Sequence, residues 1–359
     1  MLNRIEFRNF RGFKQLELTG LSQITLLTGK NGAGKSSVLE GVFSLMGFSL
    51  PDVFDRIRNL RGLPAASDIT KLWEPVFYNL DTKQPLQISA EFNGIPIHLK
   101  YVRDDSFSSV DALQNVQNTF ITFTNPANTN YALQYSYLAG SDSESGHLFL
   151  NQNGALAMAL DTGFKQHLNP LAPNTLFVKS ASANSIDDAD LASWFGDLEL
   201  TGEKQLVIDA LRIIDPTIVD VKTIVQRRYV QLYVITKESS LPVKLSGDGM
   251  CKLIYLVLAV LQNRDSIVLI DEIENGFHYS MQEKFWKILA ETANRSNTQI
   301  IATTHSYECI NHAVNGILQA NMLNDFCLFR IEKSGDSSRV ARYSGNLLMN
   351  AMDSSMEVR

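Results

Sequence analysis

The sequence predicts an α/β fold in which a parallel or mixed core sheet carries a phosphate-binding loop, with an antiparallel β insertion and a small helical region. Two observations support this class. The apolar run 24–27 leads directly into a glycine-rich loop, 29–36. Two further buried-strand patterns, 267–272 and 299–303, are separated by a helical pattern at 279–293. Strand and helix patterns that alternate in this way are typical of a parallel sheet.

The loop 29–36 reads GKNGAGKS and fills the GxxxxGK(S/T) pattern. Glycines let its backbone N–H groups turn toward phosphate oxygens, and the helix beginning near Gly34 adds the positive end of its dipole. Lys35 would reach the outer phosphates, and the Ser36 hydroxyl would bind Mg²⁺. The expected ligand is therefore a nucleoside triphosphate such as ATP. The predicted contacting residues are Gly29, Lys30, Asn31, Gly32, Ala33, Gly34, Lys35, Ser36 and Ser37.

The composition bounds the class of protein. A chain of 359 residues with 45% hydrophobic content can build a substantial core, in one large domain or two modest ones. Its three scattered cysteines form neither a disulfide framework nor a CxxC metal site, which favours a reducing compartment. Without an apolar signal run or a stretch of membrane-spanning length, we expect a cytoplasmic protein with no membrane partner. The net charge of -6 argues against non-specific coating of nucleic acid.

The opening residues alternate between apolar and polar side chains at 3–9 and again at 14–18, which predicts two strands before the buried one. Arg11 lies between them. It would reach a bound nucleotide if these strands pack beside the loop, and it would otherwise be a solvated turn residue. A helix is expected at 38–46, ending at Gly47.

A second helix, 53–62, is amphipathic and carries Arg56, Arg58 and Arg61. A charged, solvated helix face is the ordinary interpretation of such a cluster. Contact with a partner or with nucleic acid is the alternative.

From 86 to 150 the pattern changes to short alternating segments separated by Asp, Ser, Asn and Gly clusters, as in an antiparallel sheet with exposed connections. The stretches 104–109 and 141–146 (SDSESG) are expected to be loops. The strands expected in this region are 86–92, 95–102, 119–123, 131–138 and 147–150. Later strands are expected at 176–178, 219–225, 229–235, 325–331 and 340–343.

Two helices are expected between these sheet regions. The first, 189–196, would begin after Asp187 or Asp188 as its N-cap, and the second, 202–213, after Thr201. The sequence DDAD therefore falls at a helix start, which we prefer to a metal site as its interpretation.

A second anion site is expected at the start of a long apolar helix within 245–262. Ser246 would cap this helix, and Gly247 and Gly249 would leave its first N–H groups uncovered by side chains. A helix start of this kind is weak support by itself. The strand that follows it makes the interpretation stronger.

That strand, IVLIDE at 267–272, delivers two carboxylates to one edge of a parallel sheet. Asp271 would hold Mg²⁺ together with Ser36, and Glu272 would orient or deprotonate the attacking water. A right-handed crossover would bring His305 to the same edge, where it would contact the terminal phosphate. The predicted catalytic residues are Glu272, His305 and Lys35.

The ordered set GKNGAGKS, LSGDG, IVLIDE and TTHS resembles the ABC ATPase head shared by transporters, SMC-related repair proteins and OLD-like ATPases. The segments NFRGF, EIENGFHYS and ECI are more similar to the OLD-like ATPases of bacterial anti-phage defence, such as those of the PARIS or Septu type. The ending MEVR also resembles that branch and suggests a full-length chain.

The resemblance implies one bilobed ATPase domain over 1–359. The regions expected within it are 1–50 (opening strands and phosphate loop), 86–180 (antiparallel β insertion), 181–216 (helical lever), 217–310 (signature, Walker B and switch histidine) and 311–359 (C-terminal strands and tail).

The resemblance also implies that two copies sandwich two ATP molecules. Ser246, Gly247 and Gly249 of one copy would close on the phosphates held by the other. Asn275, Gly276 and His278 would form a loop that crosses between the two sites.

Two departures from the family pattern bear on this picture. The signature reads LSGDG where transporters have LSGGQ, so Asp248 would place an acid near the phosphates unless its side chain points away. The glutamine that normally senses magnesium has no clear counterpart, and Gln87 is a weak candidate.

These features favour an ATP-driven switch that forms a homodimer, or an assembly of dimers, and senses, holds or activates a separate effector in anti-phage defence. OLD nucleases continue into a catalytic domain after the ATPase, but only residues 311–359 follow the last motif here, so a nuclease or toxin acting as effector would be a separate chain. The absence of long heptads excludes a full SMC arm. The alternative is a DNA-repair ATPase that binds DNA when ATP is bound, through Arg56, Arg58 and Arg61. A transporter subunit ranks third, because the long polar sheet region is not typical of one.

Overall fold

The computed structural model describes residues 1–63, 72–107, 119–122, 132–150, 156–161, 175–179, 187–226 and 229–353. The chain divides into two compact units. The first contains Met1–Leu21, Asn31–Pro173 and Ile331–Ala341, and the second contains Ser22–Lys30, Asn174–Arg330 and Arg342–Arg359. The ending MEVR, on which part of the resemblance rests, lies outside the described residues, as do the predicted strand ends Phe123 and Tyr131.

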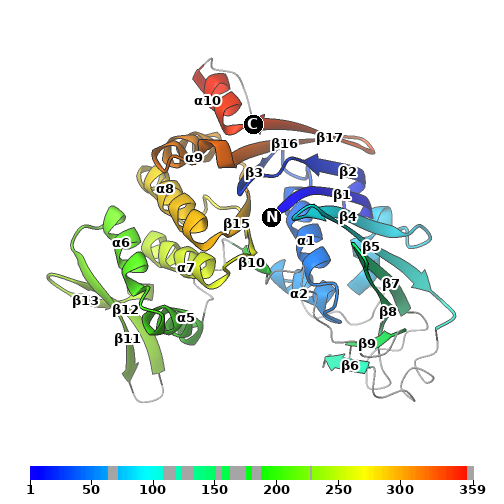
Figure 1. Ribbon diagram of the computed structural model, residues 1–359, viewed down its shortest axis with the longest axis horizontal. Coiled ribbons are helices and arrows are strands. Elements are labelled where there is room, and N and C mark those ends of the chain that lie inside the picture. Colours follow the sequence, from blue (N-terminus) through cyan, green and yellow to red (C-terminus); the bar gives the residue numbers. More distant parts are fainter. Residues whose placement is uncertain are drawn as a thin grey trace. The chain divides into compact units, whose positions relative to one another are not determined.

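The first unit is built on an eight-stranded antiparallel sheet with the order β2-β1-β4-β5-β7-β8-β9-β6 (Figure 1). Its strands are β1 Leu2–Phe10, β2 Phe13–Thr19, β4 Leu86–Phe92, β5 Ile95–Asp104, β6 Thr119–Thr122, β7 Ala132–Ala139, β8 Asp142–Leu150 and β9 Leu156–Leu160. The predicted opening strands and the predicted antiparallel region are thus confirmed. The two also share one sheet, because Ile5 of β1 pairs with Ala90 of β4.

The helices of this unit pack on the apolar face of the sheet. They are α1 Lys35–Met46 and α2 Val53–Leu60, followed by the short turns η1 Glu74–Val76 and η2 Tyr78–Leu80. Side chains of a strand point alternately to its two faces, and β4 alternates between buried and half-buried residues along its length. A Cβ at Gly41 of α1 would overlap the Phe7 ring, so this helix lies directly on the face to which Phe7 points. The opposite face is polar.

The segment 141–146 is not the loop that its composition predicted. Residues 142–146 begin β8, whose Asp142 pairs with Ala139 of β7 across a tight turn at Gly140 and Ser141. Its polar side chains have partners: the Tyr135 hydroxyl donates to Glu144 at 2.6 Å, and Ser145 donates to Asp161 at 2.7 Å. An antiparallel strand with one exposed face accepts polar residues, so composition was a misleading signal here.

The second unit is built on a six-stranded sheet with the order β10-β14-β15-β3-β16-β17, of which residues 331–341, at the end of β16 and the start of β17, are assigned to the first unit. Its strands are β3 Ile24–Thr28, β10 Thr175–Lys179, β14 Ile267–Asp271, β15 Gln299–Thr303, β16 Phe326–Ser334 and β17 Ser337–Ser344. The pairings from β10 to β16 are parallel, as expected for the core. The predicted range 86–180 had placed β10 in the antiparallel region, and this was wrong, because β10 pairs in parallel with β14.

The helices of the second unit are α5 Asp188–Leu200, α6 Lys204–Ile214, α7 Asp248–Gln262, α8 Tyr279–Ser296, α9 Tyr307–Gln319 and α10 Gly345–Asp353, with the short turns η5 Val243–Leu245 and η6 Leu323–Asp325. Helices α7, α8 and α9 pack side by side (Figure 1). Every residue of α7 from 251 to 261 is buried, which explains its continuous apolar sequence. The sequence did not predict α9, and it predicted a tail where α10 forms.

The cap predicted for the second of the middle helices was wrong. Thr201 ends α5 instead of starting α6, since its hydroxyl donates to the carbonyls of Asp197 at 3.2 Å and Leu198 at 3.3 Å. Glu203 is the N-cap of α6. Asp187 caps α5 as expected, because its side chain accepts from the N–H of Ala189.

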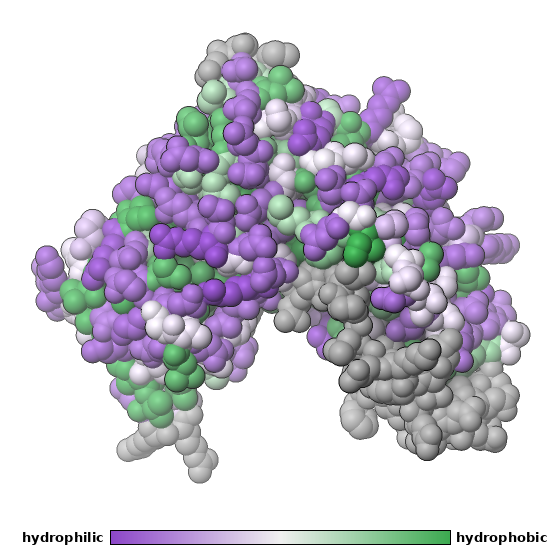
Figure 2. All heavy atoms as spheres, in the orientation of Figure 1, coloured by the Kyte–Doolittle hydropathy of each residue, from purple (hydrophilic) through white to green (hydrophobic). Residues whose placement is uncertain are grey.

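A three-stranded antiparallel sheet completes the second unit, formed by β11 Ile218–Gln226, β12 Tyr229–Thr236 and β13 Ser240–Pro242. The β11–β12 hairpin ends in exposed apolar side chains, with Val225 65% and Tyr229 76% accessible. Figure 2 shows hydrophobic residues gathered at the end of this hairpin on an otherwise mainly hydrophilic face. Within the described part of the chain, no helix is long and apolar enough to cross a membrane.

Candidate active site

The carboxyl ends of three neighbouring parallel strands in the second unit form the edge that the motifs predicted. Strand β3 leads into Gly29 and Lys30, β14 ends at Asp271, and β15 leads into His305. The strands lie in the order β14-β15-β3 and are in register at this end, because Ile270 pairs with Ala302. The start of the phosphate loop, one carboxylate and one histidine therefore leave the sheet at one edge.

Thr303 connects the two acidic residues of this edge. Its hydroxyl donates to Oδ1 of Asp271 at 2.6 Å and accepts from the backbone N–H of Glu272 at 2.8 Å. Thr303 is only 1% exposed, so water does not compete for these bonds. The sequence interpretation did not single out Thr303, whose position at a strand end was the available signal.

Glu272 adopts a left-handed backbone conformation, with φ of 52°. A residue with a side chain avoids this region unless its surroundings fix it there. Two contacts do so: the N–H bond to Thr303, and the Asn275 amide, which donates to Oε2 of Glu272 at 2.8 Å. The carboxylate proposed as the base is therefore held at both its backbone and its side chain.

His305 is oriented by an acidic residue that the sequence interpretation missed. Oε1 of Glu274 lies 3.1 Å from Nδ1 of His305 and accepts from the His305 backbone N–H at 3.0 Å. The Glu274 side chain is 8% exposed and that of His305 is 53% exposed. A proton on Nδ1 directed at Glu274 leaves Nε2 available to a ligand. In the sequence DEIE, Glu274 is the third acidic residue, and this was the available signal.

The start of α7 matches the expected anion site in outline but not in its cap. Ser246 does not cap the helix, because its hydroxyl donates backward to the carbonyl of Val243 at 2.6 Å. Gly247 is the N-cap and has no side chain to bond the first N–H groups. Asp248 occupies the first turn and is exposed to solvent. An acid there is favoured by the helix dipole.

The loop after Glu272 packs against the start of α7. A Cβ at Gly249 would lie 3.4 Å from the carbonyl oxygen of Gly276. His278 caps α8, since its ring Nδ1 accepts from the N–H of Ser280. Its predicted place in a loop that crosses between two ATP sites stays a prediction.

Lys252 is a buried cation within α7 that the sequence interpretation overlooked. It is 1% exposed, and its Nζ donates to the carbonyl of Ile273 at 2.8 Å and also to that of Asn275. Burial lowers the pKa of Lys252 to about 7, against the opposite effect of Glu274 and Glu272. The signal in the sequence was one lysine beside a long apolar run.

The phosphate loop from Asn31 onward belongs to the first unit, and Gly29 and Lys30 belong to the second. Gly34 requires glycine for two reasons: its φ is 101°, and a Cβ would overlap the Phe13 ring. Lys35 and Ser36 open α1 and are half-buried, and no acidic residue lies in the first turn of that helix. A helix start without an acidic residue in its first turn suits a phosphate group.

Arg11 is not a solvated turn residue. Its side chain is 11% exposed, and its Nε lies 3.0 Å from Oε2 of Glu40, a buried carboxylate of α1. Nη1 donates to the carbonyl of Pro75 at 2.9 Å, and Arg61 binds the second oxygen of Glu40. Nucleotide contact by Arg11 stays a prediction.

We expect Glu40→Ala to lower the free energy of unfolding by about 3 kcal/mol, because it leaves the buried Arg11 without its carboxylate. Denaturant unfolding measures this change. The control is Asp105→Ala, which removes a carboxylate 68% exposed and paired with Arg103, and should cost less than about 1 kcal/mol. Equal losses in the two variants would contradict a structural role for the buried pair.

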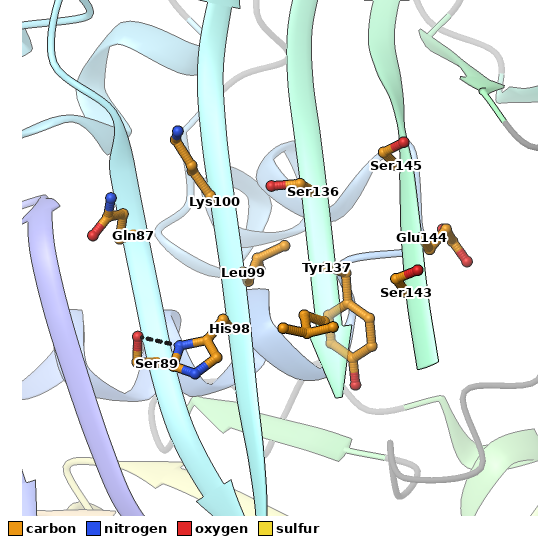
Figure 3. A pocket seen from close by; sticks show the side chains of 11 residues that line it. Gln87, Ser89, His98, Leu99, Lys100, Ser136, Tyr137, Ser143, Glu144 and Ser145 are labelled. Atoms are coloured by element: carbon orange, nitrogen blue, oxygen red, sulfur yellow. Dashed lines mark hydrogen bonds between the residues drawn. The ribbon is translucent and has the colours of Figure 1, made fainter. Parts of the chain in front are cut away.

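Gln87 does not lie on the face of the sheet that carries α1. In β4 it neighbours Ile88, which pairs with Phe7, so its own side chain points to the opposite, polar face. There it lines a groove of about 450 Å³. Figure 3 shows Gln87 and Ser89 beside His98 and Lys100 of β5, with Ser89 bonded to His98. The weak assignment of Gln87 as the magnesium-sensing glutamine is therefore withdrawn.

The AAA ATPase domain family matches residues 1–153 and 203–310, well over half of the chain. The chain belongs to this family. The protein is accordingly an AAA-family ATPase, an ATP-binding enzyme with a phosphate loop, as its motifs predicted.

Relatives and solved structures are consistent with this assignment. An ATP/GTP phosphatase of Helicobacter pylori is 24% identical over 329 residues, which is 86% of each chain. An uncharacterized protein of Methanocaldococcus jannaschii is 44% identical over 54 residues, which is 14% of this ATPase and 25% of that protein. An SMC head bound to the C-winged helix domain of ScpA has a TM-score of 0.52 at 11% identity, covering 96% of this chain and 98% of the other. The fold is that of an SMC- or ABC-type head.

Proposed function

We propose that this ATPase is a molecular switch in which bound ATP joins two copies of the chain and hydrolysis separates them. The observation that carries this proposal is the sheet edge of the second unit, where Asp271, Glu272 and His305 follow adjacent strands. Together with the phosphate loop, this edge supplies the cationic, acidic and hydrogen-bonding groups that phosphoryl transfer to water requires.

Within this proposal Glu272 accepts the proton of the attacking water as that water bonds to the terminal phosphorus, and ADP leaves with its bridging oxygen. Its position, fixed by Thr303 and Asn275, supports this role. Nε2 of His305 would donate to the terminal phosphate, and Lys35 would offset the charge of the outer phosphates. The proton of the attacking water stays on Glu272, so these roles require no other protein group to accept it.

Mg²⁺ would be held by Asp271 and Ser36. Carboxylate and hydroxyl oxygens suit this ion, which usually takes one or two protein ligands and completes its shell with water and substrate phosphate. Among the described residues, no group of three or more His, Cys, Asp or Glu could hold a metal ion. The ion would neutralise charge that develops on the phosphates.

The first turn of α7 would close on the phosphates of the other copy. Gly247 caps the helix without a side chain, and Ser246 and Gly249 flank it, so an anion can approach the first N–H groups. Asp248 is exposed and lies in the same turn, so it would have to point away from the nucleotide.

We place the switch in anti-phage defence, where it would hold or activate a separate effector such as a nuclease. The resemblance of NFRGF and EIENGFHYS to OLD-like ATPases supports this placement. Two observations favour a protein partner: the exposed apolar end of the β11–β12 hairpin, and the binding of a separate protein domain by the similar SMC head. Copurification from native cells would recover such an effector, and its consistent absence would count against the defence role.

DNA binding through Arg56, Arg58 and Arg61 is less well supported. Arg56 pairs with Asp52 at 2.9 Å, and Arg61 pairs with the buried Glu40, so both already have carboxylate partners. A steep fall of DNA affinity with salt would restore this alternative.

We expect Ser246→Arg to bind ATP normally and to fail to dimerise, because a long cationic side chain would stand where the partner phosphates approach. Sedimentation with and without ATP, in the Glu272→Gln background that retains ATP, measures this. Ser240→Arg, at an exposed serine of β13, serves as the control and should still dimerise. ATP-dependent dimers of Ser246→Arg would exclude α7 from the contact.

A further inference from the structure

Lys252 is buried in a helix that does not need a charge to fold. Ten of its neighbours in α7 are buried, from Cys251 to Leu261, and the helix packs through apolar side chains. Burying an ammonium group is unfavourable unless hydrogen bonds compensate. A methionine of similar length would fill the same space at less cost. The charge therefore serves something other than core packing.

The Lys252 ammonium group holds the loop that follows Glu272. It donates to the carbonyls of Ile273 and Asn275 and lies 4.8 Å from the centre of the Phe277 ring. One cation thus contacts every second residue of this loop, namely Ile273, Asn275 and Phe277. The close packing of Gly249 against Gly276 provides a second contact between the same helix and the same loop.

The loop in turn holds Glu272. Asn275, whose carbonyl accepts from Lys252, donates from its side-chain amide to Oε2 of Glu272 at 2.8 Å. Its backbone N–H also donates to the carbonyl of Glu272 at 3.1 Å. One residue therefore carries the connection from the ammonium group to the carboxylate. All of these groups belong to the second unit.

We propose that Lys252 is a positioning residue. It couples the position of the signature end of α7, which carries Gly247 and Gly249, to the position of the water-activating carboxylate of Glu272, and Asn275 makes the connection. Lys252 lies three residues beyond Gly249, so a shift of the helix start on ATP engagement moves the ammonium group and the carbonyls bound to it. Hydrolysis is then fast only when the signature end of α7 contacts the phosphates held by the other copy. This inference rests on the proposed role of Glu272 as the base.

The test is Lys252→Met, which keeps the length of the side chain and removes its three donors. We expect kcat to fall about 10-fold or more while ATP affinity and Tm change little, since a displacement of about 1 Å at a catalytic group can cost about 10²-fold. Lys204→Met is the matched control. It removes a lysine of the same unit that pairs with Asp220 at 3.1 Å and does not touch this loop, and its kcat should equal that of the unmodified protein.

The double variant Lys252→Met with Glu272→Gln separates positioning from general damage. If Lys252 acts through Glu272, the double variant is no slower than Glu272→Gln alone. Multiplied losses, or a normal kcat in Lys252→Met, would overturn the inference while leaving the proposed ATPase mechanism intact. Normal turnover of Glu272→Gln would instead overturn the mechanism itself.

Asn275→Ala provides a second route if the buried substitution prevents folding. It cuts the same connection at a half-buried position and should lower kcat with ATP affinity preserved. Loss of ATP affinity without loss of kcat in this variant would overturn the proposed connection.

Discussion

Glu272→Gln is expected to bind ATP and to hydrolyse it at least about 10²-fold more slowly, the loss typical of removing a general base. The substitution keeps the size of the side chain and an oxygen that can accept from Asn275, so the loop should stay in place. Single-turnover hydrolysis measures the effect on the chemical step. Because ATP is no longer consumed, the same variant should accumulate as an ATP-bound dimer in sedimentation.

The matched control is Glu291→Gln, which changes an acid of the same unit that pairs with Lys287 on the surface of α8. Its turnover should equal that of the unmodified protein. Unchanged turnover in Glu272→Gln would mean that another group activates the water, and His305, held by Glu274, would be the next residue to test.

Lys35→Ala is expected to abolish measurable ATP binding. The ammonium group opens α1, where the helix has no acidic residue in its first turn, and it would supply the only full charge that this helix start directs at the phosphates. Titration calorimetry with ATP measures the loss. The fold should persist, because Lys35 lies at the start of a helix whose buried side chains are unchanged.

Lys83→Ala, an exposed lysine of the same unit, is the control and should bind ATP as the unmodified protein does. If Lys35→Ala retains ATP affinity, the phosphates are held elsewhere, and the whole assignment of the loop 29–36 fails with it. A reduced affinity in both variants would indicate a general electrostatic effect instead.

The sequence predicted the parallel sheet because its signal is local. The runs that became β3, β14 and β15 are apolar over their full length, as expected of strands covered on both faces. The motifs follow these strands directly, so their placement at one edge required only the parallel order. For Asp271 and His305 that edge is the one observed.

Polar local signals were less reliable, because one serine or threonine can bond in several directions. Thr201 could cap the helix after it or terminate the helix before it, and its hydroxyl bonds backward to Asp197 and Leu198. Ser246 bonds backward in the same way, to Val243. Both contacts depend on where a neighbouring carbonyl lies, which a sequence pattern does not state.

Long-range partners lay outside the reach of any sequence pattern. Glu274 meets His305 across 31 positions, and Lys252 meets Asn275 across 23. Glu40 of α1 pairs with Arg11, which lies in the turn between β1 and β2. Each contact forms because packing brings together segments that no periodicity links.

By itself, then, the sequence predicted the buried strands of the parallel sheet and the motifs that follow them, because apolar periodicity and glycine-rich turns act over a few residues. Only the tertiary structure decided what orients those acids. The hydrogen bonds that fix Glu272 in its left-handed conformation come from Thr303 on the adjacent strand and from a loop held by a lysine of α7. Such bonds are set by distances of about 3 Å between folded elements, and those distances exist only after the sheet and helices have packed.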